Sequence, residues 1–136
     1  MPPDVWRKIQ DGHKFNVERR PHYASSEVRL GTGKVVDSYD HEEEIVERKH
    51  SQLARIRSET AIGYLQDTVR KYSPGRKISD TPRNRELYPD LVGKILEGRL
   101  ILEVPVQDDP VARAVLEKAA ELDVIIRDVE GKEYHL

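Results

Sequence analysis

The chain is 136 residues long and contains 23 basic and 25 acidic side chains, which gives a net charge of −2 at pH 7. With 37% hydrophobic and 35% charged residues, it is polar but long enough to bury a core as a single domain over residues 1–136. The absence of cysteine excludes a disulfide framework, a thiol nucleophile and a cysteine-ligated zinc or iron–sulfur site. Its apolar runs are far shorter than the roughly 20 residues that a membrane-spanning helix needs.

The charges are unevenly distributed along the chain. Residues 48–85 contain 10 basic and 3 acidic side chains, whereas residues 99–136 contain 5 basic and 9 acidic ones. A basic segment in an acidic protein is typical of contact with a polyanion such as nucleic acid. The alternative is a solvated surface without a ligand, and charge alone does not decide between the two.

The first half of the chain predicts a small antiparallel sheet. Residues 1–24 are expected to form a helical or irregular N-terminal segment in front of a core at residues 25–136. Three short strand-like segments then follow, at residues 27–30, 34–39 and 44–50. Gly31-Thr32-Gly33 indicates a turn after the first, and a short polar link joins the second to the third. The pattern predicts a three-stranded antiparallel meander.

A helix is predicted at residues 58–72, because apolar residues recur there at helical spacing. These residues are Ile62, Leu65, Val69 and Tyr72. Ser58 is a suitable N-cap, and Pro74-Gly75 is expected to end the helix. Residues 73–98 contain several helix-breaking residues, and we expect an irregular loop with one helical turn near residues 91–96.

The C-terminal part of the sequence predicts a strand–helix–strand unit. Residues 100–104 and 124–126 are apolar runs typical of buried strands. Asp109 and Pro110 indicate an N-cap and a first-turn proline for a helix that ends at Leu122. Two strands joined by such a crossover should be parallel neighbours. The expected fold class is therefore α/β, with an α+β mixed sheet made of the antiparallel meander and this βαβ unit.

Two carboxylates and a lysine meet in the predicted hairpin of residues 34–50. If the link centres on residue 42, Asp37 faces Glu47, Val35 faces Lys49, and Tyr39 faces Ile45, so Asp37, Glu47 and Lys49 share one face of the sheet. Two carboxylates this close repel each other unless a cation lies between them. Mg²⁺, or Mn²⁺ in its place, prefers such oxygen ligands. A lysine beside the ion suits activation of water for attack on a phosphoryl group.

Asp37 followed by Glu47-Arg48-Lys49 resembles the PD-(D/E)xK, or restriction-endonuclease-like, nuclease superfamily. The predicted order of helix, three strands, helix and strand is similar to the core of that superfamily and covers most of the chain. Val36 stands where many members have proline before the aspartate. The resemblance implies a metal-dependent nuclease in which Asp37 and Glu47 bind the ion, with the carbonyl of Arg48 as a further ligand, while Lys49 orients water.

A closer resemblance is to the C-terminal toxin nuclease domains of bacterial polymorphic and contact-dependent inhibition proteins. It rests on five stretches: residues 27–30, 36–39, 45–53, 102–107 and 125–128. It implies a toxin that is delivered as part of a larger secreted protein, cleaves DNA or tRNA in the target-cell cytoplasm, and is blocked by a cognate immunity protein. Glu27 would supply an additional acidic catalytic group, and Gln52 would line the site.

The substrate backbone is expected to contact basic side chains near the motif, because such contacts position nucleic acid without selecting its sequence. The candidates are Arg48, Arg55, Arg57, Arg70, Lys71, Arg76 and Lys77.

Three alternatives remain open. Acid-x-Lys triplets are common in so charged a chain, and Glu130-Gly131-Lys132 is a second one, so Asp37, Glu47 and Lys49 could be surface ion-pairing residues. The chain could also be a catalytically inactive nuclease fold that only binds. A metal-free ribonuclease that uses His13 or His22 together with His50 is the third alternative.

Overall fold

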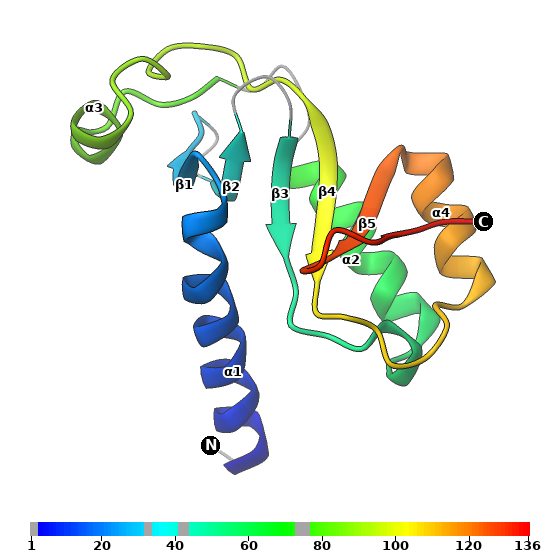
Figure 1. Ribbon diagram of the computed structural model, residues 1–136. Coiled ribbons are helices and arrows are strands. Elements are labelled where there is room, and N and C mark those ends of the chain that lie inside the picture. The colour runs from blue at the N-terminus through cyan, green and yellow to red at the C-terminus, as the bar shows by residue number, and fades with distance from the viewer. Residues whose placement is uncertain (1–2, 32–33, 41–43, 73–76) are drawn as a thin grey trace.

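The computed structural model describes residues 3–31, 34–40, 44–72 and 77–136, and these residues form a mixed α/β fold (Figure 1). Within them, four α-helices accompany one six-stranded mixed sheet with the strand order β1-β2-β3-β4-β5-β6. The strands are β1 (Ser25–Arg29), β2 (Val35–Asp40), β3 (Glu44–Arg48), β4 (Arg99–Val104), β5 (Val124–Asp128) and β6 (Glu133–Tyr134). The helices are α1 (Pro3–Arg19), α2 (Ser58–Tyr72), α3 (Pro82–Leu87) and α4 (Arg113–Leu122). The expected turn at residues 32–33, the polar link at 41–43 and the helix stop at 74–75 lie outside the described residues.

The antiparallel meander of β1, β2 and β3 is confirmed. In the β2–β3 ladder Ser38 pairs with Val46 and Tyr39 pairs with Ile45, which is the predicted register. Continued by one residue, this register sets Asp37 opposite Glu47. Because side chains alternate between the two faces of a strand, both carboxylates lie on the face that also includes Tyr39 and Ile45.

The predicted βαβ unit is also confirmed, since β4 and β5 are parallel and α4 connects them. Strand β3 is parallel to β4 as well, with Glu47 paired to Leu102 and Arg48 paired to Glu103. The short strand β6 turns back antiparallel to β5 and was not predicted. Strand β3 therefore lies inside the sheet, between the meander and the parallel strands.

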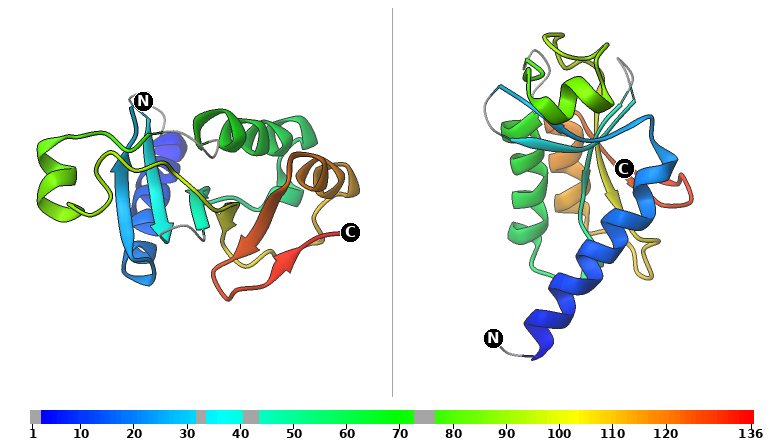
Figure 2. Two further views of the ribbon diagram at one scale, coloured as in Figure 1. Left: turned by 90° about the horizontal axis from the view of Figure 1, so that it is seen from above. Right: turned by 90° about the vertical axis from the view of Figure 1, so that its left-hand side faces the viewer.

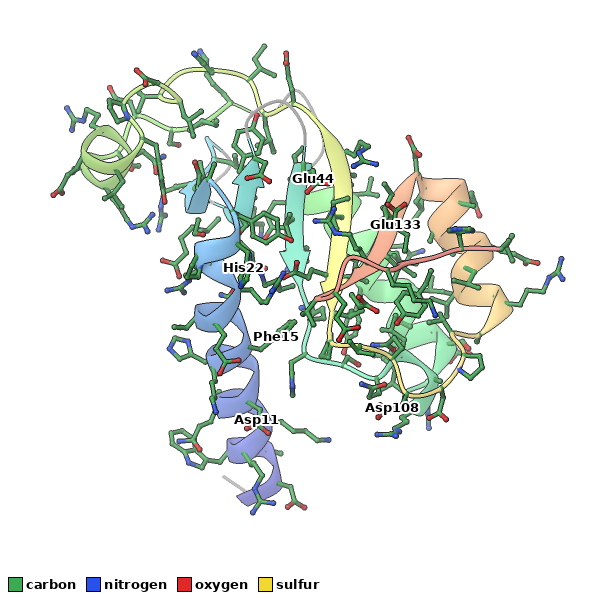
Figure 3. The ribbon with its side chains drawn as sticks, viewed as in Figure 1. Asp11, Phe15, His22, Glu44, Asp108 and Glu133 are labelled. Carbon is green, nitrogen blue, oxygen red and sulfur yellow. The ribbon has the colours of Figure 1, made fainter. Side chains whose placement is uncertain are left out.

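Helices cover the two faces of the sheet unequally. Helices α2 and α4 pack together on one face (Figure 2). The C-terminal end of α1 reaches the other face, where Arg19 donates to Glu103 and Asn16 accepts from Arg48. Leu65 of α2 and Leu102 of β4 belong to the buried core on the first face. On the second face, α1 extends beyond the end of β3, and Phe15 points from it toward the loop after β3 (Figure 3), where its ring centroid lies 5.3 Å from that of His50.

The helix predictions need correction at two points. The helix expected to begin at Asp109 begins at Arg113, with Ala112 as its N-cap; Asp109 lies before it in the non-helical connection and forms an exposed ion pair with Arg55 at 3.5 Å. In the long connection of residues 77–98, the structure adds the unpredicted helix α3. Where one helical turn was expected near residues 91–96, a hydrogen-bonded turn forms, in which the Lys94 N–H donates to the Leu91 carbonyl at 3.0 Å. The N-cap of α3, Thr81, accepts a hydrogen bond from the backbone N–H of Asn84 at 3.1 Å. Thr81 followed by proline is an N-terminal helix signal that the sequence contained.

Within the described ranges, the helices are all too short or too polar to cross a lipid bilayer.

Candidate functional site

Asp37 on β2 and Glu47 on β3 form a close, poorly solvated pair of carboxylates. Glu47 is only 4% exposed. Burial, followed by the charge of Glu47, raises the pKa of Asp37 from 3.8 to about 6. The backbone N–H of Arg48 donates a hydrogen bond to Asp37 Oδ2 at 2.8 Å and partly opposes that rise. The sheet thus holds two carboxylates together although they repel each other.

The surroundings of Glu47 leave one of its oxygens without a hydrogen bond. Oε1 lies 3.6 Å from Lys49 Nζ, whereas the buried Oε2 has no hydrogen-bond partner among the described residues. Nearby, the Tyr72 hydroxyl on α2 donates to the Val35 carbonyl at 2.7 Å. Burial, then the charge of the Glu47 carboxylate and its hydrogen-bonding closeness to the hydroxyl, raise the pKa of Tyr72. The single hydroxyl proton is directed to the Val35 carbonyl and so does not satisfy Glu47 Oε2. A buried carboxylate oxygen without a donor is costly, and a cation would satisfy it.

Lys49 is fixed from three sides at the end of β3. Its backbone N–H donates to the Glu103 carbonyl at 3.0 Å, and its ammonium lies beside Glu47. The ammonium also lies 5.1 Å from the centroid of the Tyr64 ring on α2, within the range of a cation–π contact. The side chain is 31% exposed, so the ammonium remains within reach of a ligand.

The donor set fits a small, hard cation with a partly open coordination sphere. No cluster of three or more histidine, cysteine, aspartate or glutamate side chains that could hold a metal occurs in the described part of the chain. The pair therefore offers two carboxylates, one with an unpartnered oxygen. Mg²⁺ is commonly held by one or two carboxylates while waters and substrate phosphates complete its shell. The Arg48 carbonyl as a third ligand stays a prediction.

Glu27 on β1 lies opposite Asp37, between the Ser26–Ser38 and Val28–Val36 pairs, but its carboxylate is bound by arginines. It has φ of +54° on β1, and its side chain forms ion pairs with Arg20 and, at 3.5 Å, with Arg83. It shares with Asp37 the wall of a hollow of about 390 Å³. The structure thus places Glu27 at the edge of the site, with its carboxylate already paired.

The side chain of Arg48 lies on the opposite face of the sheet from Glu47 and Lys49. It is 6% exposed and donates through Nε to Glu103 at 3.0 Å and through Nη1 to Asn16 at 2.6 Å. Glu103 is fully buried and also accepts from Arg19 Nε at 3.0 Å. Hydrogen bonds from Arg19 and Tyr23 lower the pKa of Glu103 although burial opposes this. The guanidinium of Arg48 therefore binds within the protein, away from the predicted substrate surface.

Sequence reasoning missed Glu103, Tyr64 and Tyr72 as neighbours of the motif. Glu103 interrupts the apolar run of residues 100–104, and a charge inside a buried strand signals a buried partner. The sequence pattern predicts Tyr72 as part of the apolar core stripe of its helix. Tyr64 lies eight residues earlier on the same helix, close to the same face.

The other predicted substrate residues are spread over the surface. Arg55 pairs with Asp108 at 3.0 Å, Arg70 pairs with Asp67, and Gln52 donates to the Val106 carbonyl at 2.9 Å. Those contacts do not gather the three side chains around Asp37 and Glu47. Arg57 and Lys77 are exposed and Lys71 is half-buried, while Arg76 lies outside the described residues.

The residues of the competing hypotheses are also separated. In the described residues no hydrogen bond joins His13, His22 and His50 to one another. Glu130 and Lys132 lie in and beside the turn between β5 and β6, where both backbone N–H groups donate to Asp128 Oδ1. The second acid-x-Lys triplet is thus part of a turn built around Asp128.

Comparison of this chain with protein-family models, with curated proteins and with solved structures finds no match.

Proposed function

We propose that this protein is a metal-dependent endonuclease with a restriction-endonuclease-like core, and that it hydrolyses phosphodiester bonds in nucleic acid. The observation that supports this most directly is the buried Glu47 carboxylate. Its Oε2 has no hydrogen-bond partner in the described residues. The carboxylate lies close to that of Asp37, and its Oε1 is 3.6 Å from Lys49 Nζ. A purely structural carboxylate in this position would be expected to have its hydrogen bonds satisfied.

In this proposal Asp37 and Glu47 hold Mg²⁺ or Mn²⁺. The bound ion supplies positive charge that offsets the negative charge developing on the phosphoryl oxygens. The Arg48 backbone N–H orients Asp37, and the Tyr64 ring together with the Glu103 carbonyl orients Lys49. Lys49 Nζ is thereby positioned to hold the water that attacks phosphorus and to donate to a phosphoryl oxygen.

The resemblance of the motif-bearing stretches to bacterial toxin nucleases supports a narrower proposal. The domain belongs to a larger secreted effector and cleaves DNA or tRNA in the target-cell cytoplasm, where a cognate immunity protein neutralises it in producing cells.

The proposal is tested by incubating the purified protein with plasmid DNA and with total tRNA, in Mg²⁺ or in EDTA. We expect cleavage in Mg²⁺ only, and a loss of at least about 100-fold in Glu47→Gln and in Lys49→Ala, a typical cost of removing a catalytic group. Lys132→Ala is the matched control. Lys132 is the lysine of the second acid-x-Lys pattern. Its Nζ lies 5.0 Å from the Tyr134 ring centroid, much as Lys49 lies over Tyr64.

Full cleavage by Glu47→Gln would contradict the site. Cleavage of RNA that persists in EDTA would favour the histidine ribonuclease. A folded protein that binds Mn²⁺ or nucleic acid but cleaves neither substrate would favour the inactive binding module.

A further inference from the structure

The hollow that reaches Asp37 lies between β1, β2 and the segment that precedes and begins α3. We call it the β1–β2 hollow; its walls include Glu27, Arg29, Asp37 and Asn84. Its volume of about 390 Å³ is in the range of sites that hold small ligands. Because Asp37 is one of the two proposed metal ligands, the hollow borders the proposed site of phosphate cleavage at this residue.

Strand register places Arg29 close to Asp37 on the same face of the sheet. Arg29 pairs with Val35 across the β1–β2 ladder, and Asp37 is two residues beyond Val35. Diagonal neighbours of this kind have their backbones about 7–8 Å apart, within reach of a long side chain. Arg29 is exposed, so its guanidinium is accessible from the hollow.

The charges around the hollow leave Arg29 available for an anion. The Glu27 carboxylate already forms ion pairs with the guanidiniums of Arg20 and Arg83, and Arg83 Nη1 also donates to the Glu27 backbone carbonyl at 2.7 Å. Asp37 is assigned to the metal ion. Among the residues that the structure describes, Arg29 has no carboxylate partner, unlike Arg83 beside it.

A second feature of the same wall is an unsatisfied acceptor. Asn84 is fully buried, and its Nδ2 donates to the carbonyls of Arg29 and Ser79 at 3.1 and 2.9 Å. These two bonds fix the orientation of the amide, and its Oδ1 has no partner in the described part of the chain. A bound ligand or water would supply the hydrogen-bond donor that Asn84 Oδ1 lacks.

We infer that the β1–β2 hollow binds one nucleotide next to the cleaved bond, and that Arg29 binds the phosphate adjacent to the scissile one. This inference rests on the proposed nuclease function and adds a substrate subsite to it. A guanidinium is well suited to the task, because it binds a phosphate through two parallel hydrogen bonds.

The test compares wild type, Arg29→Ala and Arg113→Ala on an oligonucleotide of the cleaved class. Arg113 is an exposed arginine on α4 with an ion pair to Glu117, so Arg113→Ala removes the same charge far from the hollow. We expect kcat/KM to fall about tenfold in Arg29→Ala and to stay within twofold of wild type in Arg113→Ala. Mn²⁺ binding, followed by electron paramagnetic resonance, should be the same in all three proteins.

The phosphate contact itself is tested with substrates in which single linkages beside the cleavage site are neutral methylphosphonates. One such linkage should cost wild type about tenfold but cost Arg29→Ala less than twofold, because the contact is already lost. If every neutral linkage costs both proteins equally, Arg29 binds no phosphate and the subsite is overturned, while the nuclease proposal stands. If wild type neither binds Mn²⁺ nor cleaves, the nuclease proposal fails and the subsite fails with it.

Discussion

At the scale of single residues, Asp37 is held at a cost to stability. Its pKa in the folded protein is about 6, against an ordinary value of 3.8, so the metal-free fold binds this proton more tightly than the unfolded chain does. The stability that the group contributes is complete below about pH 4 and is lost as the pH rises through 6. By linkage the loss is roughly 3 kcal/mol at most.

We therefore predict that Asp37→Asn abolishes cleavage yet stabilises the metal-free protein at pH 7.5. The expected gain is about 1–3 kcal/mol at pH 7.5, with little gain at pH 4. The measurement is urea unfolding at both pH values in EDTA. Asp80→Asn is the control, because Asp80 is exposed and paired with Arg85, and it should change stability by less than about 0.5 kcal/mol. A gain that is equal at both pH values would show that repulsion at Asp37 is not its cause.

At the scale of the elements, one buried carboxylate joins α1 to the strands of the site. Glu103 on β4 accepts from Arg19 at the end of α1 and from Arg48 on β3, and Arg48 also binds Asn16 of α1. Removal of one partner from a buried ionic network leaves the remaining charges unpaired in a medium of low polarity. The attachment of α1 should therefore depend on Glu103.

We predict that Glu103→Gln destabilises the protein by about 3–5 kcal/mol and speeds amide hydrogen exchange in α1 more than in α4. Glu117→Gln provides the comparison, because the Arg113–Glu117 pair is exposed and should contribute less than about 1 kcal/mol. Urea unfolding and hydrogen exchange measured by mass spectrometry give the two readouts. Unchanged exchange in α1 would mean that other contacts hold this helix.

At the scale of the whole molecule, the sequence predicted those features of the fold that depend on residues close together in the chain. The Asp37–Glu47 pairing was predictable because a short hairpin fixes its own register, and α2 was predictable from its apolar period. The Glu103–Arg48 contact was not, because it depends on the parallel pairing of β3 with β4 across 55 residues. The start of α4 was mispredicted because the Asp109-Pro110 pattern is a local signal, whereas the chain stays non-helical up to Ala112.

The proposed metal site predicts a property of the whole fold that does not depend on catalysis. An ion that binds the folded chain alone raises its unfolding free energy by about 1.4 kcal/mol for each tenfold rise in concentration above the dissociation constant. We expect the midpoint of urea unfolding at pH 7.5 to rise with MgCl₂ in wild type and in Asp80→Asn, and to stay constant in Glu47→Gln. NaCl at equal ionic strength corrects for screening of surface charges. If NaCl stabilises wild type as much as MgCl₂ does, Asp37 and Glu47 do not form a specific ion site, whatever substrate is tested.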